Sequence, residues 1–174
     1  NRFMPDTFIP QRPVVTAYPR MPEAFAEAEA MSAYLKEKGI DAPFGSLYDE
    51  ELRKRVKKRE FDLLIMAGGD GSVLRAGHLC APLGLPILGV NLGRLGFLIQ
   101  IDRQEWREYF DKLLNGEAWI ENRMMLRVEH WRAVGRGDAR TADAPAPHGR
   151  PQHGAVVERD PPRTPVPPRR HHGD

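Results

Sequence analysis

The feature that most constrains the fold is an apolar run that ends in a glycine-rich turn. Five of the six residues from 61 to 66 are large and apolar, which is typical of a short strand covered on both faces of a sheet. The turn Gly68-Gly69-Asp70-Gly71 follows, and a helix is expected over residues 72–83. A strand, turn and helix in this order indicate an α/β protein.

Strand and helix patterns alternate along the rest of the chain. Strands are expected at residues 13–18, 40–44, 86–90 and 119–131, and helices at 22–39, 48–60 and 102–115. Asp102 and Glu105 have the spacing of a capping box at the start of the last helix. This alternation predicts a Rossmann-like α/β fold, with an open, mainly parallel sheet and flanking helices.

Composition divides the chain at about residue 132. Residues 1–132 carry 19 basic and 19 acidic side chains, whereas residues 133–174 hold eight of the 16 prolines and no Leu, Ile, Phe, Met, Tyr or Trp. Such a stretch cannot bury enough apolar surface to offset its ordering entropy. We expect a loose lead-in at 1–12, one α/β domain at 13–132 and a disordered Pro/Arg-rich tail at 133–174. The tail composition is also typical of GC-rich coding DNA read out of frame.

Charge and cysteine content narrow the functional classes. The neutral charge balance of residues 1–132 argues against nucleic acid as the main partner, because nucleic-acid-binding proteins usually present a basic face. The sequence has no run of 18 apolar residues and no charged-then-apolar leader, so we expect neither a membrane span nor secretion. The lone Cys80 indicates a reducing compartment and a buried side chain. A cytoplasmic protein is therefore expected.

The turn at residues 68–71 is the first candidate site, because ligands of open α/β sheets bind at the carboxyl ends of strands. Its glycines permit a positive φ and a close backbone approach to a ligand, and its peptide N–H groups suit phosphate. Asp70 then has two functional interpretations: it accepts a proton from a hydroxyl that attacks phosphorus, or it binds Mg²⁺. The structural alternative is that Asp70 caps the following helix.

The loop after the strand at 86–90 is the second candidate. It reads Asn91-Leu92-Gly93-Arg94-Leu95-Gly96-Phe97-Leu98, and its amide, backbone donors and apolar Phe-Leu pair suit a flat base and its ribose. The first turn, continued by Ser72 and by Leu74-Arg75-Ala76, together with this loop resembles the NAD kinase family. Lipid kinases and phosphofructokinases share the first turn, whereas the second loop favours NAD kinases. The similarity extends over about residues 14–132.

This resemblance implies a phosphotransferase. With Mg²⁺ it would move the γ-phosphoryl of ATP, or of polyphosphate in some members, to the 2′-hydroxyl of the adenosine ribose of NAD, giving NADP. Asp70 matches the family's catalytic aspartate, taken as the proton acceptor for that hydroxyl. The positions matched to dinucleotide binding and its loop are Gly69, Gly71, Arg75, Asn91, Gly96, Phe97 and Leu98. Two structural, non-functional interpretations also stay open: Arg75 is a surface cation, and Phe97 is a core residue.

The resemblance fails in the last part of the chain. NAD kinases continue into a β-rich second domain that starts with an Asn-[Glu/Asp] motif, and neither is expected here. Two alternatives therefore remain: a lipid (diacylglycerol-type) kinase of the same superfamily, and a truncated, non-catalytic nucleotide-binding fragment. A homo-oligomer is expected only with the second domain present, because the family's oligomer contacts lie largely in it.

Overall fold

The computed structural model describes residues 7–93, 96–99 and 101–125, and the backbone of residues 153–158. The strands are β1 (Pro13–Ala17), β2 (Phe44–Ser46), β3 (Leu63–Gly68), β4 (Ile87–Asn91), β5 (Ile101–Asp102), β6 (Trp119–Met124) and β7 (His153–Glu158). The helices are α1 (Pro22–Glu37), α2 (Glu50–Lys57), α3 (Asp70–Cys80), the short 3-10 helix η1 (Ala81–Leu83) and α4 (Trp106–Leu114).

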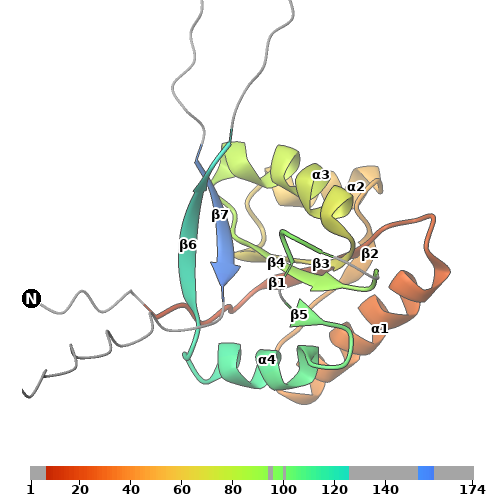
Figure 1. Cartoon of the computed structure of the whole chain (residues 1–174), viewed down its shortest axis with the longest axis vertical. Helices are drawn as coiled ribbons and strands as arrows, with labels where there is room; N and C mark the ends of the chain where they lie inside the picture. Colours follow the sequence, from red (N-terminus) through yellow and green to blue (C-terminus); the bar gives the residue numbers. More distant parts are fainter. Residues whose placement is uncertain (1–6, 94–95, 100, 126–152, 159–174) are drawn as a thin grey trace, which may run out of the picture.

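The strands form one sheet in the order β2-β1-β3-β4-β7-β6, and β5 also pairs with β4 (Figure 1). The pairs among β1, β2, β3, β4 and β5 are parallel. β7 is parallel to β4, with Val156 opposite Ile87, and antiparallel to β6. The prediction of a Rossmann-like, mainly parallel α/β fold is confirmed.

Helices cover both faces of this sheet (Figure 1). All six residues of β3 are buried, because successive side chains of a strand point to opposite faces and both faces are covered. Apolar residues of α1 and α4 pack on one face, among them Met31, Leu35, Trp106 and Phe110. Those of α2 and α3, with Val56 and Leu79, pack on the other. Loops at the ends of the strands are therefore where a ligand can reach the sheet.

Two expected element boundaries differ in the structure. β2 lies at Phe44–Ser46 rather than at residues 40–44, because the Ile40 N–H donates to the Leu35 carbonyl at the end of α1 and is not available to the sheet. The last helix starts at Trp106, since Asp102 belongs to β5. The predicted capping box is wrong: the N-cap of α4 is Glu105, and it has no side-chain cap hydrogen bond.

The segment before β1 is attached to the domain from residue 7 onward. Thr7 forms a β-bridge with Trp119, and the carboxylate of Asp62 accepts the backbone N–H groups of Gln11 at 2.7 Å and Arg12 at 2.9 Å. Residues 7–12 therefore differ from the loose lead-in that composition suggests. Residues 1–6 of that expected segment lie outside the described part of the chain.

One strand lies within the tail for which the sequence predicts no order. The backbone of His153–Glu158 pairs along its full length with β6. Composition averaged over 42 residues hides a short run with two adjacent β-branched valines, Val156 and Val157. The rest of the expected tail, residues 133–152 and 159–174, lies outside the described residues.

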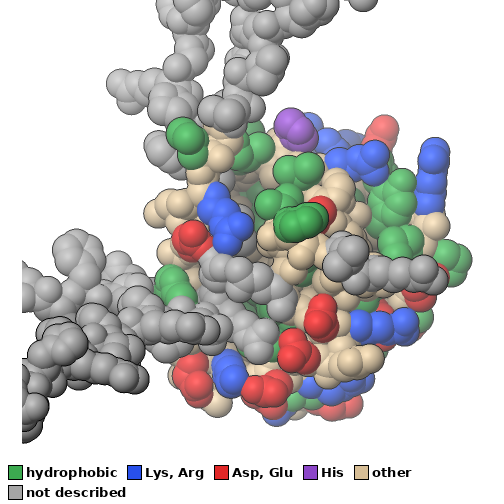
Figure 2. Space-filling model, viewed as in Figure 1, with side chains coloured by type: hydrophobic (Ala, Val, Ile, Leu, Met, Phe, Trp, Pro, Cys, Tyr) green, Lys and Arg blue, Asp and Glu red, His purple; other side chains and the backbone are tan. Residues whose placement is uncertain are grey.

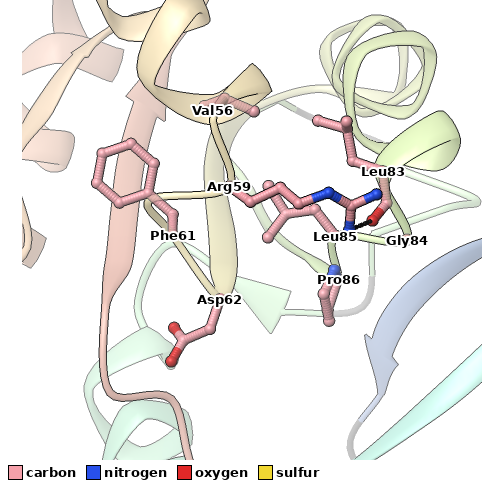
Figure 3. A pocket seen from close by; sticks show the side chains of 8 residues that line it. All are labelled: Val56, Arg59, Phe61, Asp62, Leu83, Gly84, Leu85 and Pro86. Atoms are coloured by element: carbon pink, nitrogen blue, oxygen red, sulfur yellow. Dashed lines mark hydrogen bonds between the residues drawn. The ribbon is translucent and has the colours of Figure 1, made fainter.

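A small hollow of about 150 Å³ lies at the amino ends of β3 and β4 (Figure 3). It is lined by Val56, Arg59, Phe61, Asp62, Leu83, Gly84, Leu85 and Pro86. The Arg59 guanidinium donates to the Leu83 carbonyl at 2.9 Å across one side of it. This hollow contains none of the predicted site residues, which follow the carboxyl ends of the same strands.

Candidate active site

The two loops singled out in the sequence lie side by side. β3 and β4 are adjacent parallel strands, and Gly68 at the end of β3 is in register with Asn91 at the end of β4. The backbone N–H of Leu92 donates to the Gly68 carbonyl at 2.9 Å. Both loops therefore leave the same edge of the sheet, which is the edge where ligands of such folds bind.

Asp70 joins the two loops through its side chain. It is the first residue of α3, and its Oδ2 accepts the backbone N–H of Phe97 at 2.7 Å while Oδ1 accepts that of Leu98 at 3.1 Å. The helix-cap interpretation is wrong, because the N-cap position is occupied by Gly69 and has no side-chain cap hydrogen bond. A carboxylate has about four acceptor positions, so two bonds leave it able to accept a further hydrogen bond.

Asn91 and Gly96 complete the contact between the loops. The buried Asn91 side chain accepts the Gly93 N–H through Oδ1 at 3.0 Å, which holds the start of the loop. A Cβ placed on Gly96 would lie 3.2 Å from Oδ1 of Asp70 and 3.3 Å from Nδ2 of Asn91. The backbone of the second loop therefore approaches the carboxylate and the amide at a position that suits glycine.

The glycines of the first turn serve two different purposes. A Cβ on Gly68 would meet Oγ of Ser72 at 2.7 Å, so Gly68 is required by packing. A Cβ on Gly69 or Gly71 would meet nothing within 4 Å, so these two leave open space beside Asp70. The positive φ that the sequence suggested is not used here, since Gly69 has φ −113° and Gly71 lies within α3.

Phe97 is exposed beside this contact. Its side chain is 94% exposed, although its own N–H is bound to Asp70, and Leu98 is half-buried. The alternative of Phe97 as a core residue is wrong. A large ring held in solvent by a fixed backbone is a surface on which a flat ligand can lie.

Arg75 lies apart from the other predicted site residues. It follows Asp70 by five positions, which is about 140° around an α-helix. Its guanidinium carbon is 5.4 Å from the ring centre of Tyr18 and 6.0 Å from that of Tyr48. The pKa of Arg75 is raised above its ordinary value, chiefly by the Tyr18 hydroxyl and then by Tyr48. Arg75 is exposed, as the surface-cation alternative expects, but it also lies over two aromatic rings.

Sequence reasoning missed Tyr18 and Tyr48 as site candidates. Tyr18 directly follows β1, and Tyr48 follows β2 by two residues. The sequence patterns assign the first to a strand and the second to a helix. An aromatic residue at the carboxyl end of each of two successive strands is the signal that could have found them.

The residues present suit Mg²⁺ only as a partial ligand set. Among the described residues, no group of three or more His, Cys, Asp or Glu side chains could hold a metal ion. The carboxylate of Asp70 supplies hard oxygen ligands of the kind that Mg²⁺ prefers, and Mg²⁺ is commonly held by one or two carboxylates together with substrate phosphates and water. Asp70 thus fits an ion that arrives with a nucleotide.

The fold and these two loops define an α/β nucleotide-binding domain with a Gly-Gly-Asp-Gly turn. Residues 15–118 match the model of the ATP-NAD kinase N-terminal domain. The chain therefore belongs to the NAD kinase family. In the part of the chain that the structure describes, no helix is long and apolar enough to cross a membrane.

Curated relatives agree with this assignment. The chain is 55% identical over 67 residues to an NAD kinase of Caldanaerobacter subterraneus, covering 38% of this chain and 24% of the relative. It is 33% identical over 113 residues to an NAD kinase of Dehalococcoides mccartyi, covering 65% and 39%. The chain therefore spans well under half the length of these relatives.

A solved structure shares the fold. Yeast NADH kinase complexed with NADH superposes with a TM-score of 0.53 at 20% identity, covering 66% of this chain and 38% of the yeast chain. At this identity the likeness concerns the fold of the α/β domain.

Proposed function

We propose that this chain carries the phosphotransfer site of an NAD kinase, which moves the γ-phosphoryl of ATP to the 2′-hydroxyl of the adenosine ribose of NAD. The observation that carries the proposal is the Asp70 carboxylate, held by the N–H groups of Phe97 and Leu98 where the two loops meet. Phosphoryl transfer depends mainly on positioning and charge stabilisation, and this contact fixes the carboxylate against the loop that favours NAD kinases.

Asp70 accepts a proton in the proposed reaction. The 2′-oxygen of NAD attacks the γ-phosphorus, the bond from that phosphorus to the β,γ-bridging oxygen breaks, and ADP leaves with the electron pair. The hydroxyl proton passes to the Asp70 carboxylate, so atoms and charge balance. The two backbone donors orient the carboxylate without occupying all of its acceptor positions.

The surfaces beside Asp70 suit the dinucleotide. Phe97 and Leu98 offer apolar contact to a flat base, and Asn91 fixes the loop that carries them. Gly69 and Gly71 leave open space near the start of α3, where peptide N–H groups favour phosphate oxygens. Ser72 is buried behind this turn and supports it through packing.

Mg²⁺ would be held mainly by the nucleotide phosphates, and when bound it would neutralise charge that develops on them. Asp70 is kept for the proton, because a carboxylate that binds Mg²⁺ is a weaker base. A cytoplasmic location also stays a prediction, resting on the single buried Cys80.

NADP formation tests the proposal. The chain is incubated with NAD and MgATP, and NADP is measured with an NADP-specific dehydrogenase. We expect NADP to form. If the chain phosphorylates diacylglycerol and leaves NAD unchanged, the lipid kinase alternative replaces this proposal. If it binds NAD but forms no NADP, the chain is a non-catalytic nucleotide-binding unit.

A further inference from the structure

Tyr18, Tyr48 and Arg75 form a compact group that the site around Asp70 does not use; we call it the Tyr-Arg cluster. The two rings lie 6.4 Å apart with an interplanar angle of 58°, and the Arg75 guanidinium lies over both. Tyr48 is 48% exposed, Arg75 is exposed and Tyr18 is half-buried. A cation and two aromatic faces are thus presented together at the surface.

This cluster differs from two other arginine–ring pairs in the described part of the chain. Arg107 lies 4.2 Å from the ring of Trp106, and Arg55 lies 4.8 Å from that of Phe61. Both of these rings are buried, so the cation covers the edge of the core. Tyr48 is an exposed residue and not a core residue. Shielding of the core therefore does not explain why Arg75 lies over the rings of Tyr18 and Tyr48.

The position of the cluster relates it to Asp70. The sheet order is β2-β1-β3-β4, so the ends of β1 and β2 lie on one side of the turn after β3, and the Phe97 loop lies on the other (Figure 1). Asp70 at the start of α3 stands between them. On the face in Figure 2, hydrophobic side chains are exposed next to Lys and Arg side chains near α2 and α3.

The chemistry of the cluster suits a nucleoside triphosphate. Aromatic faces stack with a purine base, and a guanidinium binds phosphate oxygens through two parallel N–H bonds. Arg75 lies about 7.5 Å along the helix axis from Asp70, a separation that a triphosphate chain spans. The apolar pair that suits the dinucleotide base, Phe97 and Leu98, by contrast follows β4.

We propose that the Tyr-Arg cluster is the binding site of the phosphoryl donor, with the purine base on Tyr48 and Tyr18 and the phosphate chain on Arg75. This rests on the proposed function, because the donor is the ATP of that reaction. It places donor and acceptor on opposite sides of Asp70, as an in-line transfer between two bound substrates requires. Arg75 is then assigned to ATP and not to the dinucleotide.

Separate titrations with MgATP and with NAD test this assignment on the full chain. We expect Arg75→Gln and Tyr48→Ala each to raise the Kd for MgATP about tenfold. Both variants should leave the Kd for NAD unchanged within about twofold. Tyr48→Phe keeps the ring and should bind MgATP like the wild type. Arg107→Gln is the matched control, since it removes another exposed arginine from an aromatic ring.

The outcomes separate this inference from the proposed function. A Kd for MgATP that is the same in Arg75→Gln as in Arg107→Gln overturns the donor site. So does a wild type that binds NAD but not MgATP, or an equal loss of both ligands in Arg75→Gln. If the variants lose MgATP while the wild type does not bind NAD, the donor site stands and the proposed function fails. Thermal unfolding of each variant confirms that the protein is folded.

Discussion

Asp70 accepts the backbone N–H of Phe97 at 2.7 Å, across 27 residues of sequence. The bond joins the first residue of α3 to the loop after β4, so the position of the carboxylate depends on two adjacent strands. It also fixes the backbone of a residue whose side chain is almost fully in solvent. The catalytic candidate and the dinucleotide surface are therefore one connected unit.

Gly96→Ala should disturb that unit without unfolding the domain. The added Cβ would lie 3.2 Å from Oδ1 of Asp70 and 3.3 Å from the Ile99 carbonyl, and the backbone atom cannot move away easily. We expect the Kd for NAD to rise roughly tenfold, since small misplacements of positioning groups are costly. Gly45→Ala, whose Cβ meets Leu52 at an ordinary 3.4 Å, is the control. Equal NAD affinity in both variants would contradict the role of Gly96.

Phe97→Ala should weaken dinucleotide binding and leave stability unchanged. The ring is exposed in the folded protein, so its removal loses little buried surface. We expect the Kd for NAD to rise about fivefold or more, because the base loses an aromatic face, with an unchanged thermal midpoint. Met124→Ala removes another exposed apolar side chain and should alter neither quantity. A drop in thermal midpoint would show that Phe97 is a packing residue.

Gly68→Ala should destabilise the domain. Its Cβ would lie 2.7 Å from Oγ and 2.9 Å from Cβ of Ser72, so the turn or the start of α3 must shift. Overpacking of this kind costs roughly 1–3 kcal/mol, measurable as the free energy of unfolding in urea. Gly77→Ala, within the same helix and with 3.6 Å to Met125, should instead stabilise by roughly 0.5–1 kcal/mol. A neutral Gly68→Ala would show that the turn is not tightly packed.

The thiol of Cys80 should be inert in the folded protein. Burial raises its pKa to about 12 from 9.0, so a thiol reagent at pH 8 should react only after unfolding. The neutral thiol is favoured in the folded state, so its contribution to stability is complete below pH 9 and is lost as the pH rises toward 12. The unfolding free energy above pH 9 should fall more steeply in the wild type than in Cys80→Ala. Rapid native labelling at pH 8 would contradict the burial.

The sequence predicts the parallel sheet and the meeting of the two loops, because unbroken apolar strands and short crossovers leave few alternatives. The bonds from Phe97 and Leu98 to Asp70 are not predictable in this way, since the direction of a loop N–H depends on the path of the whole loop. Asp102 shows the same limit: its spacing to Glu105 fits a cap, yet pairing with β4 places it in β5. Tyr18 and Tyr48 were missed because periodicity assigns each to an element and not to the edge that they share.

The most direct test of the central claim compares NADP formation by the wild type and Asp70→Asn, with NAD and MgATP as substrates. Asparagine keeps the shape but has no carboxylate to accept the proton from the 2′-hydroxyl. We predict that NADP forms in the wild type and falls at least about 100-fold in Asp70→Asn, while thermal unfolding still shows a folded domain. Equal rates of NADP formation in the two proteins would contradict the claim that Asp70 is the catalytic group.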